Sequence, residues 1–408
     1  MSDKIKKSPK IRFAGFTDAW EQCKLGGISE KVTEKNKDNN YSETLTNSAE
    51  LGIINQRDFF DKDISNKKNL DGYYVVRPDD FVYNPRISNF APVGPIKRNN
   101  LGRTGIMSPL YYVFRTHDVD KTYLEKYFSS NSWHIFMKLN GDSGARSDRF
   151  AIKDSVFREM PIPIPSVEEQ AKIGTFFKQL DNFITLHQRE LELLKETKKS
   201  LLQKMFPKDG ANVPEIRFAG FTDAWEQHRL GEMLEERNEQ IPENEEYSLM
   251  SFVQGTGVTP KVDRYDRNFL VKDVNKKYKK TELGDFIYSS NNLETGSIGF
   301  NKTGKAVISP VYSVFSSKNK MESQFIGILS TRKDFIGKML RFRQGVVYGQ
   351  WRIHEKDFLD IQITVPSHDE QKEIIGFFVN LDNLITLHRR ELNLIKNLKK
   401  SLLQQMFI

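Results

Sequence analysis

The side chains in this sequence that could do chemistry are mostly basic and amide groups in polar, glycine-rich stretches. Arginine can donate two hydrogen bonds to guanine, asparagine and glutamine can pair in the same way with adenine, and lysine binds phosphates. The candidate residues are Asn84, Arg86, Asn89, Lys97, Arg98, Arg103, Arg146 and Arg149 in the first half of the chain, and Asn291, Asn292, Lys302, Lys305, Arg343, Gln344, Tyr348, Gln350 and Arg352 in the second. Together they indicate a nucleic-acid surface, although any single one could be a solvated loop side chain.

Patterns typical of catalysis are incomplete in the sequence. Residues 299–306 nearly spell a phosphate-binding P-loop, but Ala306 stands where a serine or threonine should bind magnesium, and no apolar strand leads into the segment. Asp79 and Asp80 follow a proline in what reads as a turn. A single cysteine, Cys23, excludes an intrachain disulfide and a cysteine-based zinc site. We therefore predict no catalytic residue, metal site or cofactor in the chain itself.

Composition favours a protein with a polyanionic partner. The 408 residues include 62 lysines and arginines against 54 aspartates and glutamates, a formal charge of +8. Nucleic-acid-binding proteins share this surplus with proteins that bind membrane surfaces. The charged amino-terminal stretch is followed by no apolar run, so we expect neither a secretory signal nor a membrane span, and a cytoplasmic location.

The chain is an internal duplication. The dodecamer IRFAGFTDAWEQ starts at Ile11 and again at Ile216, a shift of 205 residues, whereas LDNFITLHQREL at Leu180 returns as LDNLITLHRREL at Leu381, a shift of 201. The second half has therefore lost a net four residues, between the landmarks Asp80-Phe81 and Ser108-Pro109 of the first half. The candidate loops lie in segments that differ between the halves, which favours a binding role for them.

Each half ends in a long helix with a marked beginning. Ser166 and Ser367 each stand three residues before a glutamate, as in a capping box, where serine and glutamate satisfy the first free amides. Apolar residues then recur with an unbroken 4,3 spacing, which predicts a coiled-coil seam. The seam residues are Ile173, Phe177, Leu180, Ile184, His187, Leu191 and Leu194 in the first helix, and Ile374, Phe378, Leu381, Ile385, His388, Leu392 and Ile395 in the second. The alternative is that each helix lies on its own domain.

Seam positions occupied by polar residues indicate alignment devices. His187 and His388 are equivalent, as are Lys198 and Lys399 further along, and an isolated polar seam residue most often fixes register. An antiparallel pair of such helices would hold their domains at opposite ends of a rod of roughly 48 Å.

The expected fold is α+β, with two pseudo-repeated α/β domains separated by two long antiparallel helices that form an intramolecular coiled coil. The expected boundaries are 1–165 and 207–366 for the domains, and 166–206 and 367–408 for the helices. Strand-like runs begin at Tyr73, Phe81, Leu110, Phe286 and Val311. The dodecamer aromatics, including Trp20 and Trp225, are expected in the cores.

The arrangement resembles the DNA-specificity subunit of type I restriction-modification systems, over essentially the full chain. The resemblance rests on Trp20, then Lys24-Leu-Gly, a variable domain, the stretch MPIPIPSVEEQAKIGTFFKQLDNFI from Met160, and the whole pattern again. It implies a non-catalytic subunit whose two target-recognition domains each read half of a split, asymmetric site in double-stranded DNA. It also implies that the helices set the unread spacer and dock two methyltransferase subunits, with two motor-nuclease subunits in the full complex. S-adenosylmethionine, ATP and magnesium would then belong to those partners.

Apolar residues beside the seam are a predicted docking surface for the methyltransferase subunits. They are Phe176, Phe183, Leu202 and Phe206, with equivalents Phe377, Leu384, Leu403 and Phe407. The alternative is that the chain's own domains cover them. Rival functions are a non-catalytic coiled-coil scaffold that joins two protein-binding domains, and a nuclease with an unrecognised site.

Overall fold

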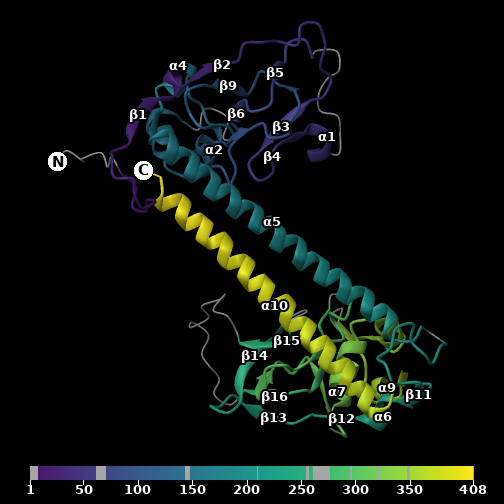
Figure 1. Ribbon diagram of the computed structural model, residues 1–408. Helices are drawn as coiled ribbons and strands as arrows, with labels where there is room; N and C mark the ends of the chain where they lie inside the picture. The colour runs from purple at the N-terminus through teal and green to yellow at the C-terminus, as the bar shows by residue number, and fades with distance from the viewer. Residues whose placement is uncertain are drawn as a thin grey trace. The chain divides into compact units, whose positions relative to one another are not determined.

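The computed structural model describes residues 8–60, 70–142, 148–208, 210–253, 257–260, 276–294, 296–319, 321–346 and 350–407 (Figure 1). The chain divides into two compact units. The first unit holds Met1–Gln188 with Arg390–Ile408, and the second holds Arg189–Arg389. Each unit therefore contains one mixed α/β part and a portion of each of the two long helices, α5 (Val167–Lys204) and α10 (His368–Gln405).

The first unit is built on an antiparallel sheet of four short strands. Its order is β2 (Ser29–Lys31), β9 (Tyr112–Thr116), β6 (Phe81–Tyr83) and β7 (Ile96–Arg98). Three two-stranded ladders join β1 (Glu21–Lys24) to β10 (Pro161–Ile164), β3 (Leu45–Ser48) to β4 (Gly52–Asn55), and β5 (Tyr74–Val76) to β8 (Gly105–Met107). The short helices are η1 (Leu25–Gly27), α1 (Gln56–Phe59), α2 (Lys121–Ser129), α3 (His134–Asn140) and α4 (Asp154–Arg158).

The second unit repeats the central sheet. Its order is β12 (Leu234–Glu236), β20 (Ser313–Ser317), β17 (Phe286–Tyr288) and β18 (Ile298–Phe300). A five-stranded sheet follows the order β13 (Gln240–Pro242), β16 (Lys277–Thr281), β19 (Ala306–Ile308), β14 (Ser248–Val253) and β15 (Gly257–Pro260). Two ladders pair β11 (Glu226–Arg229) with β23 (Gln362–Val365), and β21 (Gln344–Val346) with β22 (Gln350–Arg352). The short helices are α6 (Leu230–Met233), α7 (Glu322–Leu329), α8 (Lys333–Leu340) and α9 (Glu355–Leu359).

Aromatic side chains fill the core between each central sheet and its helices. Every residue of β6 and of β17 is buried, which fits their continuous apolar sequences. In the first unit Phe81 stacks on Phe114 with ring centroids 5.5 Å apart, and in the second Phe286 stacks on Phe358 at 5.4 Å. All five predicted strand-like runs contain strands, so the predicted strand positions are confirmed.

In each unit the beginning of one long helix packs against the end of the other. The ring of Phe407 stacks on Phe177 in the first unit, with centroids 6.0 Å apart, and Phe206 lies 6.1 Å from Phe378 in the second. The two helices are therefore antiparallel within each unit. The predicted seam residues are all buried or half-buried.

Three of the side chains predicted to leave apolar surface for a partner, Leu403, Phe206 and Phe407, are covered instead by their own unit, and Leu403 is 8% exposed. Phe206 is 1% exposed and Phe407 is 4% exposed, because each caps the aromatic core beside the other helix. For these residues the docking prediction was wrong. Phe183 and Leu384, which lie midway along the helices, are exposed as predicted.

The repeated dodecamer binds the beginning of one long helix and the end of the other. Arg12 donates two hydrogen bonds of 2.7 Å to the Glu169 carboxylate near the start of α5, and the indole of Trp20 donates to the same carboxylate at 3.1 Å. The amide of Ile11 donates to the carbonyl of Gln405 at the end of α10. The dodecamer therefore joins the two helices of the first unit.

The same joint recurs in the second unit and corrects the capping-box prediction. Arg217 donates two hydrogen bonds of 2.7 Å to Glu370, and the amide of Ile216 donates to the carbonyl of Lys204. The cap serine does accept from the glutamate amide, at 3.4 Å for Ser367. The glutamate side chain, however, binds the arginine instead of a free backbone amide, because a paired guanidinium offers two charge-assisted bonds.

The four lost residues lie in two turns. The β6–β7 connection spans residues 84–95, whereas the equivalent β17–β18 connection spans residues 289–297 and is three residues shorter. The next connection spans residues 99–104 in the first unit and 301–305 in the second, which removes one more. Most of the length change therefore falls in a loop that carries candidate binding residues.

Candidate nucleic-acid interface

Two separate candidate segments of the first unit lie side by side. An isolated antiparallel bridge pairs Arg86, in the β6–β7 connection, with Arg149, in the segment between α3 and α4. The amide of Phe150 donates to the carbonyl of Pro85 at 2.8 Å, and the amide of Ile87 donates to the carbonyl of Asp148 at 3.0 Å. The backbone therefore fixes both arginines on one surface.

These residues border a hollow of about 550 Å³. Asn84, Arg86 and Arg149 line it together with aromatic side chains that include Phe90, which is 72% exposed. The Arg86 guanidinium lies 3.8 Å from the Asp148 carboxylate, but both side chains are more than half exposed, so water screens this pair. The hollow thus combines accessible hydrogen-bond donors with apolar ring surface.

Asn84 and Asn89 differ in what they can offer a ligand. The Asn84 amide donates to the carbonyl of Asn47 at 2.9 Å and accepts from the amide of Arg86 at 3.0 Å, so it shapes the loop. Asn89 is exposed in the same connection. We expect Asn84 to act mainly as a positioning group and Asn89 to be open to a ligand.

The second unit brings together the equivalent pair of segments. Asn291, in the β17–β18 connection, accepts from the amide of Trp351 in β22 at 2.6 Å, and Ser290 accepts from the amide of Ile353 at 3.0 Å. The β21–β22 hairpin, which contains Gln344, Gln350 and Arg352, is therefore held beside this connection, with Asn292 in the same loop. Gln344 and Gln350 are exposed at the two ends of paired strands.

The two arginines of this surface differ in how strongly neighbouring side chains hold them. Arg343 donates to Glu294 at 2.9 Å, and its guanidinium lies 4.5 Å from the ring centre of Trp351. Arg352 lies 3.4 Å from Glu355, while its side chain remains 55% exposed. Arg352 is therefore the more accessible of the two cations.

Five other candidates lie outside these paired loops, and the structure pairs four of them with carboxylates. Arg98 donates to Asp79 at 2.9 Å, Arg103 makes two 2.8 Å bonds to Glu43, Lys302 donates to Asp382 at 2.7 Å, and Lys305 pairs with Glu246. The hydrogen bond from Arg103 holds the pKa of Glu43 below its ordinary value, against the opposing effect of burial. Lys97, on β7, is half-buried, and this burial lowers the pKa of its amine. Their role in binding nucleic acid stays a prediction.

Two candidates, Arg146 and Tyr348, lie outside the described residues. The sequence reasoning missed the exposed aromatic rings of these surfaces, Phe90 and Trp351. Each stands in a divergent segment close to a candidate arginine, and that placement was an available signal. Aromatic rings beside cations are common where proteins contact bases.

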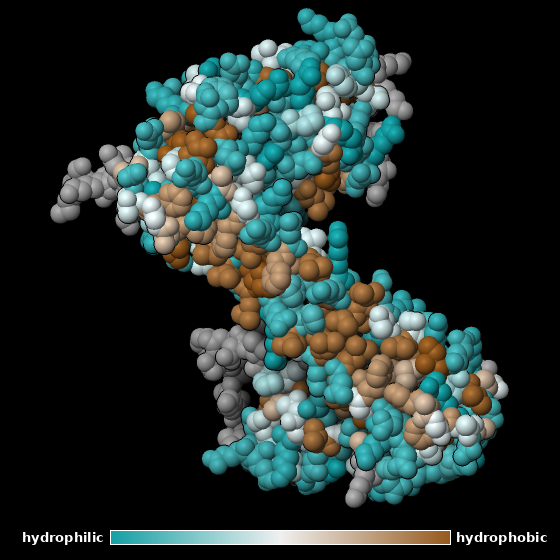
Figure 2. Space-filling model, in the orientation of Figure 1, coloured by the Kyte–Doolittle hydropathy of each residue, from teal (hydrophilic) through white to brown (hydrophobic). Residues whose placement is uncertain are grey.

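The long helices carry a second candidate surface, for a protein partner. The exposed apolar residues are Phe183, Leu186, Leu394 and Leu398 in the first unit, and Leu193, Leu384 and Leu387 in the second. Each directly precedes a seam position, so within each unit they lie on one side of the antiparallel pair. Figure 2 shows apolar surface, in brown, over these helices.

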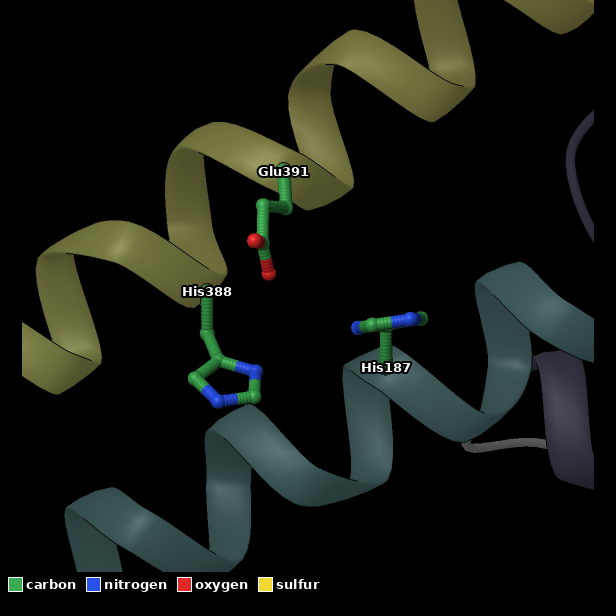
Figure 3. A group of neighbouring side chains, drawn as sticks. All are labelled: His187, His388 and Glu391. Carbon is green, nitrogen blue, oxygen red and sulfur yellow. The ribbon is translucent and has the colours of Figure 1, made fainter.

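The two seam histidines are half-buried positions on different helices. Figure 3 shows His187 carried by α5, and His388 and Glu391 carried by α10. In the second unit the His388 ring lies 4.0 Å from the Glu190 carboxylate. This placement at the helix seam agrees with a role in alignment.

None of the helices in the described part of the chain has the length and apolar character needed to cross a membrane.

Two solved structures share this fold along nearly the whole chain. The type I restriction-modification S subunit from M. genitalium superposes with a TM-score of 0.59 at 14% identity, covering 98% of this chain and 99% of that one. The HsdS subunit from Thermoanaerobacter tengcongensis gives a TM-score of 0.51 at 16% identity, covering 99% of both chains. At such identities the likeness shows the fold alone.

Curated relatives point to the same family. The type I restriction enzyme MjaVIII specificity subunit of Methanocaldococcus jannaschii is 24% identical over 271 residues, and the putative MjaX specificity subunit of the same organism is 22% identical over 266 residues. The matched part is 62% of this chain in both cases and 62% and 60% of the relatives, so the chain spans about three fifths of their length. A family model described as the type I restriction modification DNA specificity domain matches residues 17–196 and again residues 222–397. Because these two matches cover most of the sequence, the chain belongs to the type I restriction modification DNA specificity domain family.

Proposed function

We propose that this chain is the DNA-specificity subunit of a type I restriction-modification complex, and that each unit reads one half of a bipartite, asymmetric site in double-stranded DNA. One observation carries the proposal. In both units, two segments that differ between the halves are joined side by side, and they present exposed arginine, asparagine or glutamine next to an aromatic ring. These side chains can read base edges in the major groove.

The half-sites should differ because the two surfaces offer different groups on one scaffold. The first unit presents Arg86, Asn89 and Arg149, whereas the second presents Gln350 and Arg352 on a β-hairpin. Arginine favours guanine and glutamine favours adenine, so unlike sets of donors select unlike sequences. The paired lysines and arginines elsewhere in each unit could contribute phosphate contacts.

The long helices are proposed to set the length of the unread spacer. A helix of 38 residues rises about 57 Å, which exceeds one turn of duplex DNA, about 34 Å. Helices of this length are therefore long enough to serve two readers on separate turns of DNA. The heptad seam and the dodecamer joints would keep that length constant.

Partner subunits are proposed to supply all chemistry. The exposed apolar face beside the seam is well suited to two methyltransferase subunits, because apolar surface of this kind commonly marks a protein interface. Two motor-nuclease subunits would complete the complex. S-adenosylmethionine, ATP and magnesium would bind to those partners, and this chain would be non-catalytic.

Selection of DNA from a random pool of duplexes tests the proposal against its rivals. The probe is the complex of this chain with its methyltransferase partner, followed by sequencing of the retained DNA. We expect a motif of two unlike half-sites separated by a fixed number of unread base pairs. A coiled-coil scaffold for proteins would retain no motif, and a nuclease would shorten the duplexes once magnesium is added; either result contradicts the proposal.

A further inference from the structure

In the first unit, one aspartate links three elements. Asp181 of α5 accepts from Lys126 of α2 at 2.8 Å, and it also pairs with Lys399 of α10. The Lys126 side chain is only 10% exposed, and those of Asp181 and Lys399 are about one third exposed or less. The carboxylate therefore joins the two long helices to each other and to the α/β part.

The second unit contains an equivalent link with the helices exchanged. Asp382 of α10 accepts from Lys302, in the turn after β18, at 2.7 Å, and it pairs with Lys198 of α5. Asp382 and Asp181 are equivalent positions in the repeated LDN sequence, as Lys198 and Lys399 are in the repeated KKS sequence. The ion pair between the two long helices, which we call the inter-helix arm of the link, is thus present in both halves.

The lysine that joins the aspartate to the α/β part comes from a different element in each unit. Lys126 belongs to a helix, whereas Lys302 belongs to a turn between strands, so the two lysines are not equivalent in the duplication. Position 327, which lies 201 residues after Lys126, is a glycine. Inheritance from a common half explains the inter-helix arm. It does not explain why both aspartates also bind a lysine from the divergent part.

The links are electrostatically favourable in spite of their partial burial. Burial opposes ionisation of Asp181, but the hydrogen bonds and charges of Lys126 and Lys399 hold its pKa below the ordinary value. The same balance holds for Asp382 with Lys198 and Lys302. A half-buried carboxylate with two ammonium partners prefers one geometry, because displacing either lysine leaves charge poorly solvated.

We propose that Asp181 and Asp382 are positioning residues that fix the orientation of each DNA-reading part on the helix pair, and thereby narrow the range of spacer lengths that the protein accepts. The inference rests on the proposed function, because it presupposes two half-sites. The lysine on the α/β side is the informative partner. Its removal loosens the reading part while the inter-helix pair remains intact.

Selection from a random duplex pool measures half-site sequence and spacing at once. Lys126→Met and Lys302→Met each remove the charge that binds the aspartate while keeping a side chain of similar length. With the methyltransferase partner present, we expect Lys126→Met, which changes no candidate DNA-binding residue, to select the wild-type half-site motifs. Discrimination against spacers one base pair longer or shorter should fall by about fivefold, the effect of losing one ion pair.

Matched variants separate orientation from general stability. Lys178→Met removes an exposed charge from the same helix as Asp181 and should keep the single wild-type spacing, and Lys126→Arg should restore it. Lys302 is 36% exposed, so its replacement tests the second unit with little risk to folding. Unchanged spacing in both methionine variants, or equal weakening at every spacing, overturns the inference. A wild-type protein that selects no bipartite motif overturns the proposed function instead.

Discussion

The arginine side chains of this protein have different roles, which can be distinguished by the groups that they contact. Arg12 and Arg217 join the dodecamers to helix beginnings, whereas Arg86 and Arg149 are held by backbone bonds on an open surface. The sequence could single out the basic loops but not this division, because the partners are distant. Arg103, a candidate for base reading, binds Glu43, which lies 60 residues earlier.

Replacement of single arginines tests the reading surfaces. Arg149→Ala should cost about 1 to 3 kcal/mol of DNA binding and relax one position of the first half-site, and Arg352→Ala should do the same in the second. Affinities for duplexes with single base changes measure this. Arg98→Ala is the control, because its loss breaks pairs with Asp79 and Glu125 and should leave base preference unchanged. Equal weakening on all sequences would reassign Arg149 or Arg352 to phosphate contact.

The long helices were the most predictable elements, and their joints were the least. A 4,3 repeat is a local pattern, so the seam followed directly from the sequence. The serine cap was also predictable. The role of Glu169 was not, because a glutamate in the first helical turn can satisfy a nearby amide or a distant guanidinium, and only the tertiary fold brings Arg12 within reach.

Loss of Arg12, which joins the first dodecamer to the start of α5, should strongly destabilise the first unit. The Glu169 side chain is fully buried, so Arg12→Met leaves a buried carboxylate whose remaining side-chain partner, among the described residues, is the Trp20 indole. We expect a loss of about 3 to 5 kcal/mol in the free energy of unfolding, measured with urea. The double variant Arg12→Met with Glu169→Gln should recover part of this loss. If Arg12→Met alone loses less than about 1 kcal/mol in the free energy of unfolding, the proposed role of the Arg12–Glu169 pair is contradicted.

The aspartate link predicts an acid-dependent contribution to stability. Because the folded protein lowers the pKa of Asp181 from its ordinary value of 3.8, this contribution is complete above that value and is lost as the pH falls through the folded pKa. Glu125 and Lys97 are the other charged groups near the lysine partners. Asp181→Asn should therefore lower urea stability at neutral pH, and its deficit should shrink towards about pH 3. A deficit independent of pH would contradict the ionic link.

At the scale of the whole molecule, the first unit is completed by residues from the far end of the sequence, whereas the second unit is one continuous segment. The domain boundaries expected from the sequence separate helices from α/β parts, whereas the contacts divide the chain at Gln188 and Arg390, within both long helices. Periodicity reveals where a helix lies but not which core receives its end. The end of α10 enters the first core because Met406 and Phe407 pack there.

Truncation of the Phe407 side chain tests whether the end of α10 completes the core of the first unit. Phe407→Ala should cost about 3 to 5 kcal/mol, because the ring is buried against Phe177 and Tyr123. Hydrogen exchange should accelerate in the first unit, which is distant in sequence, more than in the second. Phe206→Ala is the matched variant and should show the opposite preference. Acceleration confined to residues near each substitution in the sequence would contradict the arrangement.

Methylome sequencing of cells that express this chain with its partner subunits tests the central claim most directly. The account predicts new adenine methylation at one motif made of two unlike half-sites with a single spacer length. A methylated motif that is continuous or palindromic, or the absence of any new motif when all subunits are present, would contradict it.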